Sequence, residues 1–225
     1  YFDFHFYNYY VMTTRYIIAR YNESIGWLHP ILNQCLIFNK GATLGLANET
    51  KLKNVGRESE TYLRYIIENY DNLPDICVFS QGGIKDHMIL RLYRRTPHIY
   101  LKQLAIEAKG NIPQSSDWRY HIRGRDYQNH ISWGINPKIG NQQGRGEPSR
   151  KDNHLKFKEW FAKNIRKDLP TKELYHYPFA LFAVTKNQIL KHPKKYYENL
   201  IKEVNWDTNP IEGHYFERSW YYIFN

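Results

Sequence analysis

The chain has 225 residues and a formal net charge of +10, and 42% of its residues are hydrophobic. This length fits one α/β domain or at most two small ones, and the hydrophobic content excludes a largely disordered chain. The apolar runs are too short to span a bilayer as helices. The sequence has no internal repeat and no low-complexity linker, so we predict a single domain over residues 1–225.

The positive charge has two interpretations. Lys and Arg side chains neutralise phosphates, so the charge fits nucleic-acid binding, but it also fits a basic cleft for a diphosphate ligand or an acidic partner. We favour the cleft, because no nucleic-acid-binding motif accompanies the charges. Cys35 and Cys77 lie in apolar runs, and we expect two buried thiols rather than a disulfide framework or a zinc site.

Predicted strands and polar turns alternate through the first third of the chain. Apolar runs indicate strands at 15–19, 35–38, 51–55 and 75–79. Polar turns are expected at 20–23, 39–41, 54–57 and 81–87. A helix follows the third turn, because five apolar residues have helical spacing there: Tyr62, Leu63, Ile66, Ile67 and Tyr70.

The start of this helix is a candidate ligand site. Gly56 permits a backbone conformation that a side chain would hinder, and Arg57 lies beside the N–H groups of the first helical turn. Such a helix start suits an anionic or polar ligand. The alternative is an ordinary capped surface helix.

The second half of the chain is predicted to hold helices at 97–108 and 156–166, a strand at 179–184 and a final helix at 214–224. Pro193 interrupts a turn before a further helical face. The glycine-rich region around 111–155 is irregular, and segments of this length are often functional. The apolar faces of the last two helices are formed by Tyr197, Leu200, Ile201 and Val204, and by Phe216, Trp220, Ile223 and Phe224.

Alternation of strands and helices predicts an α/β fold with a mostly parallel central sheet flanked by helices. In such sheets, ligands bind beyond the carboxyl ends of the strands. We therefore expect the four polar turns to converge on one edge of the sheet.

Short collinear pieces of the sequence match a known family. They are 19–23 with Trp27, 39–41, 54–57, 61–63, 66–71, 78–79, 81–82, 86–87, 182–184, 192–193, 209–210 and 213–220. These pieces cover both ends of the chain and skip roughly 90–174. Through them the chain resembles a family of GT-A-type glycosyltransferases, which includes the amino-terminal domain of the chlorella-virus enzyme that builds the capsid glycan, and mostly uncharacterised fungal and viral relatives.

The resemblance implies a single nucleotide-diphospho-sugar transferase domain with a UDP-sugar donor and Mn²⁺ or Mg²⁺. It points to transfer of rhamnose or a hexose to a glycan or glycoprotein, such as a viral capsid protein. It implies a cytoplasmic protein, in the host cytoplasm if viral, with neither a nucleic-acid partner nor a membrane span.

The resemblance also implies a donor site at the ends of the strands. Tyr21 would pack on the base and Asn22 would form amide hydrogen bonds, while Asn54 and Arg57 would contact ribose or phosphate. The alternatives are a solvated loop and simple helix capping. The full set of expected donor-binding residues is Arg20, Tyr21, Asn22, Glu23, Lys40, Asn54, Gly56, Arg57, Gln81 and Gly82.

The expected metal site departs from the family's pattern, because no Asp-x-Asp follows the fourth strand. Either Gln81, Asp86 or His87 supplies a ligand, or waters and the diphosphate complete the coordination. His214 is a further candidate for the metal or the diphosphate. Asp86 and His87 are equally explained as ordinary loop and helix-start residues.

The final helix carries a polar face. His214, Glu217 and Tyr221 have i, i+3, i+7 spacing, roughly opposite the apolar stripe. Arg218 would offset leaving-group charge, and Glu217 would orient the acceptor or act as base in an inverting reaction. The alternative is an exposed surface helix.

The middle of the chain would line an acceptor groove through Trp118, Tyr120, Arg123, Arg125, Tyr127 and Trp133. We interpret His121, His130 and His154 as surface or acceptor-side residues.

Two other functions remain open. Basic residues with interleaved aromatics also fit a nucleic-acid-binding module. The missing acidic pair also fits a carbohydrate- or nucleotide-binding descendant that has lost activity.

Overall fold

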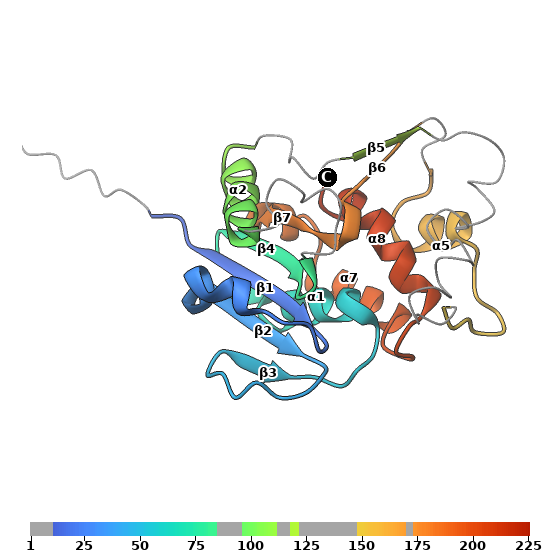
Figure 1. The fold of residues 1–225 in the computed structure, drawn as a ribbon. Coiled ribbons are helices and arrows are strands. Elements are labelled where there is room, and N and C mark those ends of the chain that lie inside the picture. Colours follow the sequence, from blue (N-terminus) through green and yellow to red (C-terminus); the bar gives the residue numbers. More distant parts are fainter. Residues whose placement is uncertain (1–10, 85–95, 112–117, 122–147, 170–172) are drawn as a thin grey trace, which may run out of the picture.

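The computed structural model describes residues 11–84, 96–111, 118–121, 148–169 and 173–225 (Figure 1). Its centre is a five-stranded sheet in the order β3-β2-β1-β4-β7. The first four strands in the chain are parallel, and β7 runs antiparallel to β4 at one edge. The strands are β1 (Thr14–Arg20), β2 (Cys35–Asn39), β3 (Glu49–Lys51), β4 (Ile76–Gln81) and β7 (Phe182–Thr185).

Helices cover both faces of this sheet (Figure 1). One face packs on α1 (Arg57–Glu68) and α8 (Ile211–Phe224). Behind them, α7 (Lys194–Leu200) packs against α1, and α5 (Phe157–Asn164) packs against α8. The other face packs on α2 (Pro97–Lys109) and the 3-10 helix η1 (Gly26–Gln34). A small antiparallel pair, β5 (Trp118–His121) and β6 (Glu173–His176), lies beside α8. The short helices are η2 (Tyr70–Asn72), η5 (Pro178–Ala180), α6 (Lys186–Ile189) and η6 (Ile201–Glu203).

The alternation of side chains along the strands builds two cores. Ile17 and Phe79 point toward the α1–α8 face, whereas Ile18 and Val78 point toward α2 and η1. All four side chains are fully buried. Each such burial contributes about 1.5–3 kcal/mol, so the sheet is held firmly between its two helical layers.

Most predicted elements are confirmed. The strands at 15–19, 35–38 and 75–79, the helix at 97–108, the amphipathic helix after the third turn and the final helix at 214–224 are present, with ends shifted by no more than three residues where bounds were predicted. The predicted helix at 156–166 ends at Asn164. Cys35 and Cys77 are buried and free, and burial raises the pKa of both thiols to about 12. In the part of the chain that the structure describes, no helix is long and apolar enough to cross a membrane.

Two strand predictions need correction. The predicted strand at 51–55 is wrong beyond Lys51, because the Val55 N–H bonds to the Lys53 carbonyl in a turn and its carbonyl accepts from Lys40. The strand predicted from residue 179 begins only at Phe182. Phe179 and Ala180 have φ angles of 61° and 51°, which do not fit a strand.

Candidate functional site

A cleft of about 380 Å³ opens at the carboxyl ends of the parallel strands. The chain leaves β1 toward β2 on one side, whereas β4 pairs with the other side of β1. Such a switch point leaves a crevice where ligands commonly bind in α/β sheets. We call this hollow the carboxyl-edge cleft. It is lined by Ala19, Arg20, Tyr21, Glu23, Lys40, Asn54, Arg57, Glu58, Gln81, Thr208 and Asn209.

The predicted convergence of the polar turns is therefore confirmed for the described residues, whereas 85–87 of the fourth turn lie outside them. Seven of the expected donor-binding residues line the cleft, while Asn22, Gly56 and Gly82 are not among its lining residues. Sequence reasoning singled out neither Glu58 nor Thr208 as a site residue. It noted Asn209 only as part of a matching piece; the Asn-Pro pair just before the last helix was the available signal.

Arg20 holds two loops together. Its side chain is only 7% exposed. Its Nε donates to the Glu23 carbonyl at 2.9 Å, and its Nη1 donates to Asn39 Oδ1 and the Ala42 carbonyl, both at 2.8 Å. Most donors of this guanidinium are thus already used inside the protein. Its positive charge remains at the cleft, but its main role is to join the turns that follow β1 and β2.

Those two turns touch directly. A Cβ on Gly41 would lie 1.5 Å from the Tyr21 carbonyl oxygen, so no side chain fits there. Asn22 adds a second link, because its Oδ1 accepts from the Ala42 N–H at 2.8 Å. Asn22 therefore serves the loop contact and does not line the cleft.

Lys40 supports the glycine turn before α1. Its Nζ donates to the carbonyls of Val55 and Arg57, each at 2.5 Å, and pairs with Glu60 at 2.9 Å. Burial lowers the pKa of Lys40, and the nearby Glu60 carboxylate opposes that shift. Since a lysine has three donors, these contacts use all of them. Lys40 therefore lines the cleft as a buried structural cation.

The glycine turn aims Arg57 at the cleft. Gly56 has a φ of 64°, and a Cβ there would lie 2.8 Å from the Val204 carbonyl oxygen. Its N–H donates to the Asp207 carbonyl at 2.7 Å. Arg57 itself has a φ of 52°, a costly conformation for a residue with a side chain. Left-handed backbone of this kind persists only where surrounding contacts hold it.

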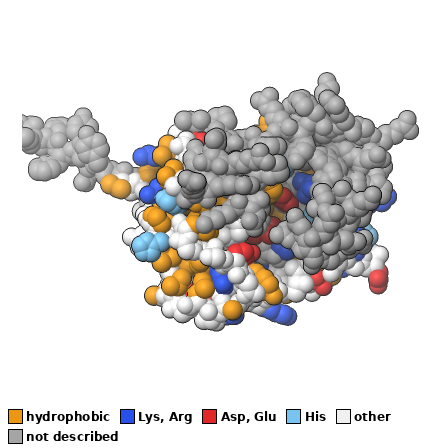
Figure 2. Space-filling model, viewed as in Figure 1, with side chains coloured by type: hydrophobic (Ala, Val, Ile, Leu, Met, Phe, Trp, Pro, Cys, Tyr) orange, Lys and Arg blue, Asp and Glu red, His pale blue; other side chains and the backbone are white. Residues whose placement is uncertain are grey.

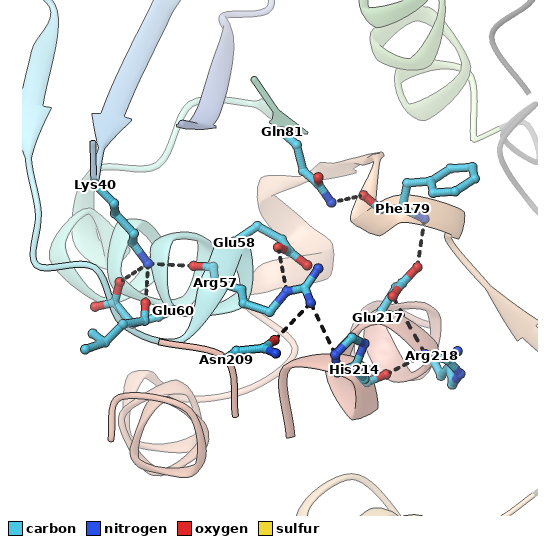
Figure 3. Close-up of polar contacts among 11 residues, drawn as sticks. Lys40, Arg57, Glu58, Glu60, Gln81, Phe179, Asn209, His214, Glu217 and Arg218 are labelled. Carbon is cyan, nitrogen blue, oxygen red and sulfur yellow. Dashed lines mark hydrogen bonds and ion pairs between the residues drawn. The ribbon is translucent and has the colours of Figure 1, made fainter. Parts of the chain in front are cut away.

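The guanidinium of Arg57 spans α1 and α8 (Figure 3). Nη1 lies 3.1 Å from Asn209 Oδ1 and 3.2 Å from His214 Nε2, and Nε lies 3.6 Å from Glu58 Oε2. Because arginine only donates, His214 Nε2 must be the acceptor and His214 carries its proton on Nδ1. The Arg57 side chain is 24% exposed, so it keeps a face toward the cleft.

A strained segment lies between β4 and α8. Since β7 is antiparallel, the residues before it lie at the same edge as the end of β4. The Phe179 carbonyl accepts from Gln81 Nε2 at 2.9 Å, and the Phe179 N–H donates to Glu217 Oε1 at 3.2 Å (Figure 3). Gln81 and Glu217 thereby clamp the left-handed Phe179–Ala180 segment from both sides.

The predicted polar face of the last helix is half-buried rather than exposed. Arg218 Nη1 donates to the His214 carbonyl at 2.8 Å and lies 3.7 Å from Glu217 Oε2. Tyr221 stacks on Tyr175 with ring centroids 5.0 Å apart. Of this face, the Glu217 side chain is 24% exposed and the Arg218 side chain 11% exposed.

The described residues do not fit a metal ion. Within the described ranges, no three His, Cys, Asp or Glu side chains are grouped to hold one. The predicted ligands Asp86 and His87 lie outside these ranges, as do His130 and the acceptor-groove residues Arg123, Arg125, Tyr127 and Trp133. His214 is described, but its Nε2 lone pair accepts from Arg57.

The cleft mixes charges of both signs. Glu23 Oε2 accepts from the Tyr21 N–H at 2.7 Å and rests over Gly82, where a Cβ would lie 3.2 Å away. Glu23 and Glu58 offset Arg20 and Arg57. Acidic and basic side chains are also interspersed on the face in Figure 2. Tyr21 is 51% exposed and offers an apolar ring at the rim. This arrangement suits a ligand with one anionic group and many hydroxyls.

A family model described as "Protein of unknown function (DUF3431)" matches residues 16–225. The chain therefore belongs to this family. No curated protein matches the chain, and no solved structure matches it.

Proposed function

We propose that this member of the DUF3431 family is a glycosyltransferase, which binds a UDP-sugar in the carboxyl-edge cleft and moves the sugar to a hydroxyl of a glycan or glycoprotein. The main support is one observation: a partly exposed arginine, Arg57, enters a polar cleft at the switch point of the sheet. The order β3-β2-β1-β4-β7 with an antiparallel edge strand is compatible with a GT-A-type domain.

In this proposal, different lining residues bind different parts of the donor. Arg57 binds the diphosphate, because a guanidinium donates to two phosphate oxygens at once. The exposed ring of Tyr21 packs on the uracil. Glu23, Asn54 and Glu58 bind hydroxyl groups of the ribose and the sugar, since carboxylates and amides accept from hydroxyl donors.

The transfer step breaks the bond between the anomeric carbon and the diphosphate oxygen, and the electron pair leaves with UDP. The acceptor oxygen bonds to the same carbon and loses its proton. Arg57 and Arg218 stabilise the charge that develops on the leaving group. We assign Glu217, the partly exposed carboxylate on the polar face of α8, as the base that accepts this proton in an inverting displacement.

Titration calorimetry tests the binding half of this proposal. UDP, GDP and ADP are compared with and without Mn²⁺. We expect UDP to bind and Arg57→Ala to weaken it by about 10- to 100-fold, since hydrogen bonds to charged groups contribute about 1.5–3 kcal/mol. Lys102→Ala removes the same charge from the exposed side of α2 and should leave affinity unchanged. Failure of all three nucleotides to bind, with and without the ion, would refute the proposal.

Two outcomes would favour the alternatives. Tight UDP binding without turnover of any UDP-sugar would indicate an inactive nucleotide-binding protein, consistent with Gln81 and Glu217 being committed to Phe179. Retention on single-stranded oligonucleotides at physiological salt would indicate a nucleic-acid-binding protein. The mixed charges of the cleft argue against the second outcome.

A further inference from the structure

The turn that leads into α8 contacts Arg57 along two separate routes. The Asp207 carbonyl accepts from the Gly56 N–H at 2.7 Å, directly before Arg57 in the chain. Two residues later, Asn209 Oδ1 accepts from Arg57 Nη1 at 3.1 Å. One turn thus constrains both the backbone directly before Arg57 and the guanidinium at the end of the Arg57 side chain.

The carboxylate of Asp207 holds this turn in shape. Its Oδ1 accepts from the Asn209 N–H at 2.8 Å and from Ser149 Oγ at 2.8 Å. The first contact is an Asx turn, in which a carboxylate bonds to the backbone two residues on. These hydrogen bonds lower the pKa of Asp207. The side chain of Asp207 is not part of the cleft lining, whereas its neighbours Thr208 and Asn209 are.

Ser149 anchors the turn to another part of the chain. Its N–H donates to the Asn209 carbonyl at 2.9 Å, and its carbonyl accepts from the Ile211 N–H at 3.0 Å. Pro210, between these two residues, is the N-cap of α8. The turn is therefore fixed on one side by Ser149 and on the other by the start of a buried helix.

Arg57 needs this external support. Its φ of 52° is unfavourable for a residue with a side chain, so the turn before α1 relaxes if its contacts are lost. Gly213 also contributes, because a Cβ there would lie 3.3 Å from Arg57 Cδ. The Arg57 side chain packs on the start of α8. The position of that helix start depends on the Asp207 turn.

We propose that Asp207 is a positioning residue that sets the Arg57 guanidinium for the diphosphate of the donor, acting through Asn209 and Gly56 from outside the cleft. The identity of the ligand rests on the function proposed above. The positioning of Arg57 does not, because it concerns contacts within the protein alone.

A double-mutant cycle tests the coupling, with UDP as the probe. We expect Asp207→Ala to weaken UDP binding about 10-fold and Asp207→Asn, whose Oδ1 still accepts from the Asn209 N–H, to restore most of the affinity. In an Arg57→Ala background, Asp207→Ala should have no further effect. An equal loss in both backgrounds would show that Asp207 acts independently of Arg57 and would overturn the proposal.

A second readout needs no ligand. The NMR signal of the Arg57 Nε–H group is assigned by its absence in Arg57→Lys. We expect this signal to shift in Asp207→Ala and to keep its wild-type position in Asp207→Asn. An unchanged signal in Asp207→Ala would overturn the positioning role. Absence of UDP binding in the wild type, together with the expected shift, would refute only the proposed function.

Ser149→Ala keeps the test decisive if Asp207→Ala does not fold. This change removes one hydrogen bond to the Asp207 carboxylate and leaves the carboxylate in place. We expect the same signal to shift less, and UDP binding to weaken by about 2- to 3-fold. No shift and no loss of affinity in a folded Ser149→Ala protein would count against the proposal.

Discussion

Arg57 on α1 and His214 on α8 lie 157 residues apart in the sequence, and their side chains meet with Nη1 and Nε2 3.2 Å apart (Figure 3). The contact has a chemical consequence, because it requires an unprotonated Nε2 on His214. It also joins the glycine turn before α1 to the polar face of the last helix. Those two segments are the ones that the sequence marked as candidate sites.

Removing the His214 imidazole should loosen Arg57. We expect His214→Ala to weaken UDP binding by about 3- to 10-fold, the effect of losing one hydrogen bond to a charged group that keeps its other partner. Calorimetry on the purified variant measures this. The control is His154→Ala, which removes a partly exposed imidazole that contacts the carbonyl of Lys151, three residues earlier in the chain. Equal affinities in wild type and His214→Ala would show that Arg57 does not need this partner.

Gly41 should tolerate no side chain. A Cβ there would overlap the Tyr21 carbonyl oxygen at 1.5 Å, so the turns after β1 and β2 would have to separate. We expect Gly41→Ala to lower the free energy of unfolding by about 3 kcal/mol or more. Urea denaturation measures the loss. Gly26→Ala is the matched control, because no atom lies within 4 Å of its added Cβ. A Gly41→Ala protein as stable as Gly26→Ala would mean that the two turns do not touch as described.

The Glu217→Gln variant separates the proposed catalytic role of Glu217 from its structural role. The amide oxygen can still accept from the Phe179 N–H, so we expect the free energy of unfolding to change by less than about 0.5 kcal/mol. Loss of the proposed base should lower kcat by about 100-fold or more with little change in KM. Steady-state kinetics with a UDP-sugar and thermal denaturation are measured on the same preparation. Normal turnover in Glu217→Gln would remove Glu217 as the base.

Stability should fall in mild acid because of His176. Burial, with a further contribution from Arg218, lowers the pKa of this histidine from 6.5 to about 3. Between these values the unfolded chain binds a proton that the folded protein does not. The stabilisation is therefore complete above pH 6.5 and is lost as the pH falls toward 3. We expect about 2 kcal/mol to be lost between pH 7 and pH 5.

Urea denaturation of wild type and His176→Gln at pH 7 and pH 5 checks this. The glutamine variant should lose less stability between the two pH values. His154→Gln, at a partly exposed position, should behave like wild type. A pH dependence that is identical in all three proteins would show that His176 does not titrate between the folded and unfolded states as expected.

Most of the strands and helices could be predicted from the sequence. The apolar spacing of α1 and α8 predicted which sides would be buried, and Tyr62, Leu63, Phe216 and Trp220 are fully buried. The convergence of the turns also followed, because parallel strands place their carboxyl ends at one edge. Local pattern and the geometry of parallel sheets are sufficient for these predictions.

The roles of individual site residues could not be predicted from the sequence. Arg20 and Lys40 have the chemistry of ligand-binding cations, yet both are buried and bonded to backbone carbonyls. Whether a cation meets a ligand or a carbonyl depends on which loops pack around it, and that packing involves residues distant in the sequence. The left-handed conformation of Phe179 was hidden for the same reason, since contacts with Gln81 and Glu217 hold it.

The sequence alone determined the order of most strands and helices of the central sheet and its covering layers, their buried faces and the edge where polar turns gather, because these depend on periodicity and on residues close together in the chain. Only the tertiary structure decided that Arg57 would meet Asn209 and His214, and that the Asp207 turn would support it. Those contacts join residues about 150 positions apart, and they form only when α8 packs against α1. Hydrogen bonds across such a distance leave no periodic signal in the sequence.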